Sequence, residues 1–401
     1  VLFFNCEVRT SRRPGCLKDT PISALDGKLP QKNLLFFNSF FQKSVTFLFP
    51  NFHKTQKTTP KSWVNPFYRE KIIFIGIQTI IDIDYLYRKL LSNLMYPIKK
   101  LIVCLDQSPL DQTLIAFAGF IAKVNQVKKI YFANVIKNFS LPKEMQEEFP
   151  TLIEQMLAER KAYMEELVAA QFPKIKGLEL SFVVKEGNLS KKILKLAEEK
   201  SVDLILLGRK VELVGTGVAS QRLSRRASCS LLIIPEKSQP KFTKFLVPSD
   251  FSEHSKNALE EGILWAKKYG GETELFFQNV FTVPSGFHFT GKSFEEFTQL
   301  LKKDSESSFK KFIREIDTKG IQITPVYTPD ADDNPVQEIV STALELQADV
   351  ILIGAKGKTG ATALHIGSMA ERLIQFNNRV PLLVSRPKGK NAGVLDYLVE
   401  I

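Results

Sequence analysis

The chain has 401 residues, which is too long for one ordinary domain and indicates two or three. A composition of 44% hydrophobic and 24% charged residues excludes a disordered, collagen-like or disulfide-framework protein. The net charge of +12 is concentrated in residues 1–94, where 14 lysines and arginines face 6 acidic residues, and the remainder is nearly balanced. The charge therefore does not predict a nucleic-acid partner.

The cysteines and histidines are few and scattered. The four cysteines are at positions 6, 16, 104 and 229 and form no close pair, and only four histidines accompany them. We therefore expect no zinc site, and the cysteine usage favours a reducing compartment, so a cytoplasmic location is expected. The most apolar stretch of the first 94 residues, 72–83, falls short of the roughly 20 apolar residues that span a bilayer, and no membrane partner is expected.

Residues 1–94 differ from the rest of the chain. They contain one alanine and three glycines but eleven phenylalanines, with no sustained helical or strand period. Met95 directly precedes the first regular strand pattern. We expect the native product to begin near Met95, with 1–94 as an N-terminal extension outside it or disordered. A small accessory domain and a targeting segment are the alternatives.

An internal repeat organises the remainder, because residues 98–236 and 242–388 follow one pattern. The segment 100–108, from Lys100 to Ser108, matches 244–252 at an offset of 144, and 203–208 matches 349–354 at an offset of 146. Offsets that drift by so little over a hundred positions indicate a duplication.

Each copy alternates five strands with four helices. In the second copy the expected strands are 245–249, 274–280, 321–327, 350–353 and 381–385, and the expected helices are 255–269, 294–316, 335–346 and 367–376. Ser252 is placed to cap the first of these helices, and Gly270-Gly271 to end it. Because the strands are short, nearly continuous apolar runs, the pattern predicts an α/β fold with a parallel sheet and helices on both faces.

The loop between the fourth strand and the fourth helix of the second copy is rich in glycine. Gly354, Gly357 and Gly367 would let backbone N–H groups approach a phosphate closely, and Ser368 adds a hydroxyl in the first turn of the helix. Lys356 and Lys358 lie between the glycines, and Asp250 ends the first strand, where a ribose hydroxyl could be bound.

These motifs resemble the universal stress protein family. The resemblance rests on Gly-x2-Gly-x9-Gly-Ser, on Pro248-Ser249-Asp250-Phe251-Ser252 and on Asn279-Val280. It covers residues 98–388 as a tandem pair and implies two flavodoxin-like (adenine nucleotide alpha hydrolase-like) domains, each with a five-stranded parallel sheet. The expected domains are 95–238 and 239–390, followed by a tail at 391–401.

The resemblance also implies ATP, with or without Mg²⁺, as the ligand of a stress-response regulator. Its nucleotide-binding residues would be Ser249, Asp250, Val280, Ile353, Gly354, Gly357, Gly367 and Ser368. Of these, Asp250 and Val280 would flank the ribose and adenine, and Ile353 and Gly354 would line the base and sugar side. Gly357, Gly367 and Ser368 would hold the phosphates.

The first copy departs from this motif. Val211 replaces the second glycine, Val218 replaces Ser368, and Glu212 adds a negative charge beside them. We therefore expect the first copy to bind ATP poorly and to act as a pairing partner. The resemblance implies that the two halves mimic a two-fold dimer with their fifth strands near each other. A further homodimer of whole chains is left open.

Alternatives to nucleotide binding remain at this stage. Glycines after a strand often make only a tight turn, Asp106 and Asp250 can simply cap a helix, and Arg222, Arg225 and Arg226 suit a solvated face better than a nucleic acid. No catalytic set of residues is recognisable, so an enzyme is not expected beyond a weak ATP hydrolase. The other reading is a nucleotide-free scaffold or dimerisation module.

Overall fold

A computed structural model describes residues 98–136, 147–210, 217–330, 332–356 and 366–386. The expectations for residues 1–94 and for the tail at 391–401 fall outside these ranges.

The first half has the predicted alternation of strands and helices. Its elements are β1 (Lys100–Cys104), α3 (Leu110–Asn125), β2 (Lys129–Ile136), α5 (Leu152–Gln171), β3 (Glu179–Glu186), α6 (Leu189–Lys200), β4 (Leu204–Arg209), α7 (Gly217–Arg226) and β5 (Ser230–Pro235).

The second half repeats this order, with a 3-10 helix, η4, as an addition that the sequence pattern did not indicate. Its elements are β6 (Lys244–Pro248), α8 (Glu253–Tyr269), β7 (Glu274–Thr282), η4 (Ser285–Thr290), α9 (Phe294–Ile313), β8 (Ile323–Asp330), α10 (Pro335–Glu345), β9 (Val350–Gly354), α11 (Ser368–Phe376) and β10 (Leu382–Ser385).

Local signals set the helix ends close to where the sequence predicted them. The Ser252 hydroxyl accepts a hydrogen bond from the Ser255 backbone N–H and caps α8, which ends at Gly270 with a φ of 70°. Ser293 and Glu296 form a reciprocal capping box at the start of α9. α9 ends three residues before the predicted position, at Ile313.

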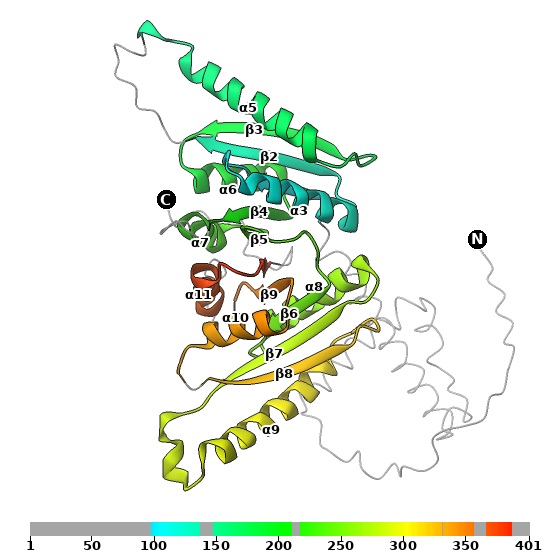
Figure 1. Ribbon diagram of the computed structural model, residues 1–401, viewed down its shortest axis with the longest axis vertical. Coiled ribbons are helices and arrows are strands. Elements are labelled where there is room, and N and C mark those ends of the chain that lie inside the picture. The colour runs from blue at the N-terminus through cyan, green and yellow to red at the C-terminus, as the bar shows by residue number, and fades with distance from the viewer. Residues whose placement is uncertain (1–97, 137–146, 211–216, 331, 357–365, 387–401) are drawn as a thin grey trace, which may run out of the picture. The chain divides into compact units, whose positions relative to one another are not determined.

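All ten strands of the described ranges belong to one sheet, in the order β3-β2-β1-β4-β5-β10-β9-β6-β7-β8 (Figure 1). Within each half the strands are parallel and follow the order 3-2-1-4-5, which confirms the predicted fold class. The halves meet at β5 and β10, which pair antiparallel with Leu383 opposite Leu232. The expectation that the fifth strands lie near each other is confirmed, because they are hydrogen-bonded neighbours.

The sheet is covered on both faces. One core cluster runs across both halves and joins the sheet to α3, α5 and α8. The opposite face holds two separate clusters, one under α6 and α7 and the other under α10 and α11.

Phe242, in the segment between the halves, links them through the shared core. Its side chain is fully buried, and its ring lies 5.9 Å from that of Phe117 and 5.4 Å from that of Phe120, both on α3. On the other side it lies 5.4 Å from Trp265 of α8. The two halves therefore share aromatic packing as well as a sheet.

Candidate functional site

A pocket of about 260 Å³ lies at the carboxyl ends of β6, β7 and β9, beside the start of α11. The winding of the second half reverses here, since β6 pairs with β7 on one side and with β9 on the other. Ligands of open parallel sheets bind at such a point. The lining residues are Pro248, Ser249, Asp250, Ser255, Gln278, Val280, Pro335, Ile339, Ile353, Gly354, Lys356, Gly367, Ser368, Met369 and Ala370.

The structure brings together seven of the eight predicted site residues. Ser249, Asp250, Val280, Ile353, Gly354, Gly367 and Ser368 all line the pocket. Gly357 lies outside the described residues, as do Lys358 and His365. Four separate segments of the second half supply the seven residues, and all of them line one pocket.

The turn between β6 and α8 is fixed by its own polar side chains. The Ser249 hydroxyl lies 2.8 Å from that of Ser255 and accepts from the Phe251 N–H at 3.0 Å. Asp250 Oδ1 accepts from the Ser252 N–H at 3.1 Å, and Phe251 takes a left-handed φ of 60°. Asp250 therefore holds the turn while it lines the pocket, and the cap of α8 is Ser252 rather than Asp250.

The repeated asparagine of the Asn-Val motif ties neighbouring strands together. Asn279 Nδ2 donates to the Ser249 carbonyl at 2.9 Å, and Asn134 Nδ2 donates to the Leu105 carbonyl at 2.7 Å at the matching place in the first half. Both side chains are buried. The asparagine thus holds the turn after the first strand in each copy, and Val280 beside it packs against the α10 and α11 core while it lines the pocket.

Gly354 is required by the packing of α8. A Cβ atom at this position would lie 2.5 Å from the backbone oxygen of His254 and 2.9 Å from its carbonyl carbon. The neighbouring backbone of His254 therefore leaves no room for a side chain at this position.

The start of α11 contributes partial positive charge to the pocket. Gly367 is the N-cap residue, and because it has no side chain it leaves the first N–H groups of the helix without a side-chain cap. Lys356 lines the same pocket, and its pKa is lowered by burial and, to a lesser extent, by the charge of Arg386. Helix N–H groups and a lysine suit an anionic ligand group.

Several lining residues were not singled out from the sequence. Pro335, Ile339 and Met369 add apolar surface from α10 and α11, and Gln278 adds a buried amide from β7. The sequence could have pointed to Gln278 as a site residue, because it is a polar residue inside an apolar strand.

The universal stress protein family matches residues 97–235 and 241–386, which together make up well over half of the chain. The chain belongs to the universal stress protein family. The matched ranges confirm the resemblance and the tandem arrangement.

Curated relatives are single-domain in extent. Universal stress protein MJ0531 of Methanocaldococcus jannaschii is 31% identical over 147 residues, which cover 37% of this chain and 84% of the relative. Universal stress protein MJ0577 of the same organism is 28% identical over 160 residues, which cover 36% of this chain and 96% of the relative.

Solved structures similar to this chain differ in how much of it they cover. A universal stress protein from Archaeoglobus fulgidus covers 75% of this chain and 100% of its own, with a TM-score of 0.49 and 19% identity. A universal stress protein in complex with cAMP covers 35% of this chain and 97% of its own, with a TM-score of 0.25 and 19% identity.

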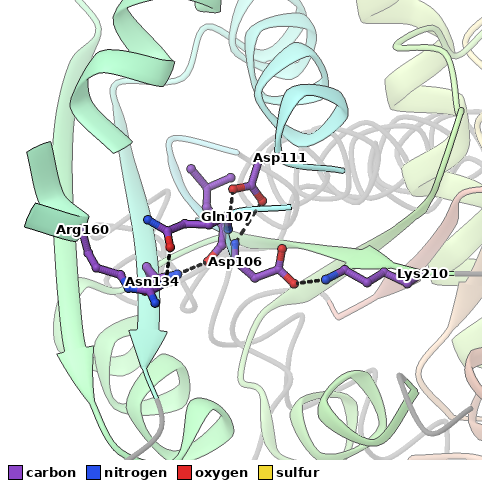
Figure 2. Close-up of polar contacts among 7 residues, drawn as sticks. Asp106, Gln107, Asp111, Asn134, Arg160 and Lys210 are labelled. Atoms are coloured by element: carbon purple, nitrogen blue, oxygen red, sulfur yellow. Dashed lines mark hydrogen bonds and ion pairs between the residues drawn. The ribbon is translucent and has the colours of Figure 1, made fainter. Parts of the chain in front are cut away.

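The first domain of this universal stress protein uses the matching residues differently (Figure 2). Asp106 corresponds to Asp250, and its Oδ2 lies 2.6 Å from Nζ of Lys210, the residue after β4. Burial acts to raise the pKa of Asp106, but the hydrogen bond and charge of Lys210 together with hydrogen bonds from Ser108 outweigh it, and the pKa is lowered. The carboxylate already has a cation as its partner.

Asp111 holds the turn of the first domain in place of the serines of the second. Its two carboxylate oxygens accept from the N–H groups of Asp106 at 3.0 Å and Gln107 at 2.8 Å (Figure 2). Burial raises the pKa of Asp111 to about 6, against the opposing effect of these bonds. Gln107 takes a φ of 63°, and its side chain accepts a hydrogen bond from Arg160 of α5. Val211 and Glu212 lie outside the described residues, so weak binding by this domain stays a prediction.

Other chemistry is not indicated in the part of the chain that the structure describes. No group of three or more histidine, cysteine or acidic residues there could hold a metal ion. No helix among the described residues has the length and apolar character to cross a bilayer. Cys229 is buried, and burial raises the pKa of the Cys104 thiol, which disfavours the reactive thiolate.

Proposed function

We propose that this universal stress protein binds ATP at one site, in its second domain, and acts as a cytoplasmic regulator without a nucleic-acid or membrane partner. One observation carries the proposal, namely that seven of the predicted nucleotide-binding residues line a single pocket beside the uncapped start of α11.

Each side of the pocket suits one part of a nucleotide. Val280, Ile339 and Ile353 offer apolar surface for a base, and the Asp250 carboxylate is a natural acceptor for ribose hydroxyls. The first N–H groups of α11, with the Ser368 hydroxyl, would bind phosphate oxygens, and Lys356 would balance their charge. Mg²⁺ would be held largely by phosphate oxygens and water, so it requires no dedicated cluster of protein ligands.

The first domain would serve as a permanent structural partner. Its Asp106, which corresponds to Asp250, is held by Lys210. Binding of ATP to the second domain would stabilise the folded pair by mass action, and a partner protein that prefers the ATP-bound form would respond to it.

Isothermal titration calorimetry of the full chain with ATP and Mg²⁺ tests the proposal. We expect one ATP per chain. Asp250→Asn keeps an acceptor for the Ser252 N–H but loses the charge of the carboxylate, so we expect about a tenfold loss of affinity. The matched variant Asp106→Asn should change the affinity by less than about twofold, because it alters only the first domain.

The result would contradict the proposal if two nucleotides bound per chain or if the two variants had equal effects. Absence of ATP binding would favour the nucleotide-free scaffold instead. A parallel titration with cAMP distinguishes a triphosphate site from a cyclic nucleotide site, since cAMP lacks the two outer phosphates that α11 and Lys356 would hold.

A further inference from the structure

Gln278 is a fully buried amide inside an apolar strand. It follows Leu275, Phe276 and Phe277 of β7, and its exposed fraction is 0%. A buried amide is costly unless its donors and acceptors are bonded. The bonds that Gln278 makes, and the one that it lacks, therefore need an explanation.

The amide nitrogen is well satisfied. Nε2 of Gln278 donates to Thr342 Oγ1 at 2.9 Å and to Thr328 Oγ1 at 3.0 Å, and the Glu338 carbonyl oxygen lies 3.4 Å away. A backbone carbonyl oxygen only accepts hydrogen bonds. The atom of the Gln278 amide that faces the Glu338 carbonyl of α10 must therefore be the nitrogen and not the oxygen.

The amide oxygen is different. Among the described residues, Oε1 of Gln278 is buried and has no hydrogen-bond partner. Gln278 also lines the pocket, two residues before Val280 on the same face of β7. A molecule in the pocket is therefore a candidate partner for this oxygen.

We propose that Oε1 of Gln278 accepts a hydrogen bond from the exocyclic amino group of the bound base and so selects a 6-aminopurine. This inference rests on the proposed function, because it concerns the base of the nucleotide. The neighbouring lining residues Val280, Ile339 and Ile353 are apolar, so Gln278 would supply a polar contact to the base edge. A base with an oxo group at that place would set two acceptors against each other.

The first domain has no such group. The Asn134 and Asn279 motifs align, which places Ala133 at the position of Gln278, and Ala133 is a buried apolar residue of the α6 and α7 core. Base selection by an amide would thus be specific to the second domain.

The test compares ATP with purine riboside 5′-triphosphate, which lacks only the 6-amino group, by calorimetry on the full chain. For the wild-type protein we expect the analogue to bind about tenfold more weakly, as for one lost hydrogen bond. In Gln278→Met, which keeps the length of the side chain but removes the amide, the two ligands should bind within about twofold of each other. Thr342→Val removes one partner of Nε2 and leaves the oxygen in place, so this control should retain the discrimination.

Different failures have different meanings. Equal binding of ATP and the analogue by the wild-type protein would overturn the inference and leave the ATP site standing. Discrimination that persists in Gln278→Met would also overturn it, since another group would then read the base. Binding of neither ligand would overturn both the inference and the proposed function. Circular dichroism and thermal unfolding of each variant ensure that the comparison is made on folded protein.

Discussion

Arg209, at the end of β4 in the first domain, donates a hydrogen bond of 2.6 Å from Nη2 to the carbonyl oxygen of Gln375, near the end of α11 in the second domain. Its Nη1 donates to the Ile374 carbonyl. In the opposite direction, Arg386 follows β10 and donates to the Ser224 carbonyl in α7 at 2.5 Å. Each domain thus supplies a cation to the carbonyl end of a helix in the other, where the helix dipole favours positive charge.

We expect Arg209→Met to destabilise the protein. The substitution leaves the buried carbonyl oxygen of Ile374 and the partly buried one of Gln375 without their donors, which costs about 2–3 kcal/mol of unfolding free energy. The control is Arg225→Met, because Arg225 pairs with Glu371 between α7 and α11 but its side chain is 55% exposed. Such a pair contributes less than about 1 kcal/mol. Urea unfolding measures both, and equal losses would show that Arg209 has no special role at the junction.

Gly354→Ala and Gly208→Ala form a second matched pair. A Cβ atom at Gly354 meets the rigid His254 backbone at 2.5 Å, whereas one at Gly208 meets the Leu110 side chain at 2.4 Å. A side chain can move aside more easily than backbone, so we expect a loss of about 2–4 kcal/mol for Gly354→Ala and about 1–2 kcal/mol for Gly208→Ala. Thermal unfolding compares them, and the reverse order would mean that the start of α8 yields more easily than the Leu110 side chain.

Glu261 of α8 should make stability depend on pH. It is 2% exposed, and burial raises its pKa, although hydrogen bonds from Ser385 and Trp265 and the charge of Lys268 oppose the shift. The folded protein therefore binds this proton more tightly than the unfolded chain, whose glutamates titrate near pH 4. The stabilisation is complete below about pH 4 and is lost as pH rises through the raised pKa.

Glu261→Gln keeps the shape of the side chain and cannot ionise. We expect its melting temperature to match that of the wild-type protein near pH 4.5 and to exceed it by about 2–4 °C at pH 8. Melting curves across this range, recorded by circular dichroism, provide the measurement. A difference that stays constant with pH would rule out ionisation of Glu261 as the cause.

The strands and helices were predictable because their signals are local. Ser252 and Gly270 mark the ends of α8 within the sequence itself, and the apolar run 350–353 identifies β9. The pairing of β5 with β10 was expected only from the family resemblance. An apolar run such as 231–233 predicts a buried strand but does not indicate which strand pairs with it.

The candidate site was predictable as a set of residues but not as a set of contacts. Asp250, Val280 and Gly367 were placed by motif, and they line one pocket. The ion pair of Asp106 with Lys210 joins residues 104 positions apart, and the bonds of Gln278 reach across to α10 and β8. The pattern of apolar and polar residues within one helix or strand does not predict these contacts, because they depend on how separate elements pack together.

The antiparallel pairing of β5 with β10 has a consequence for the association of the two domains. Two separate single-domain molecules would find each other only at sufficient concentration and could exchange with any similar subunit. Here the complementary edges are tethered on one polypeptide, so their effective local concentration stays high however dilute the cell contents become. Dilution would not separate such halves, so each molecule keeps the same two domains as partners.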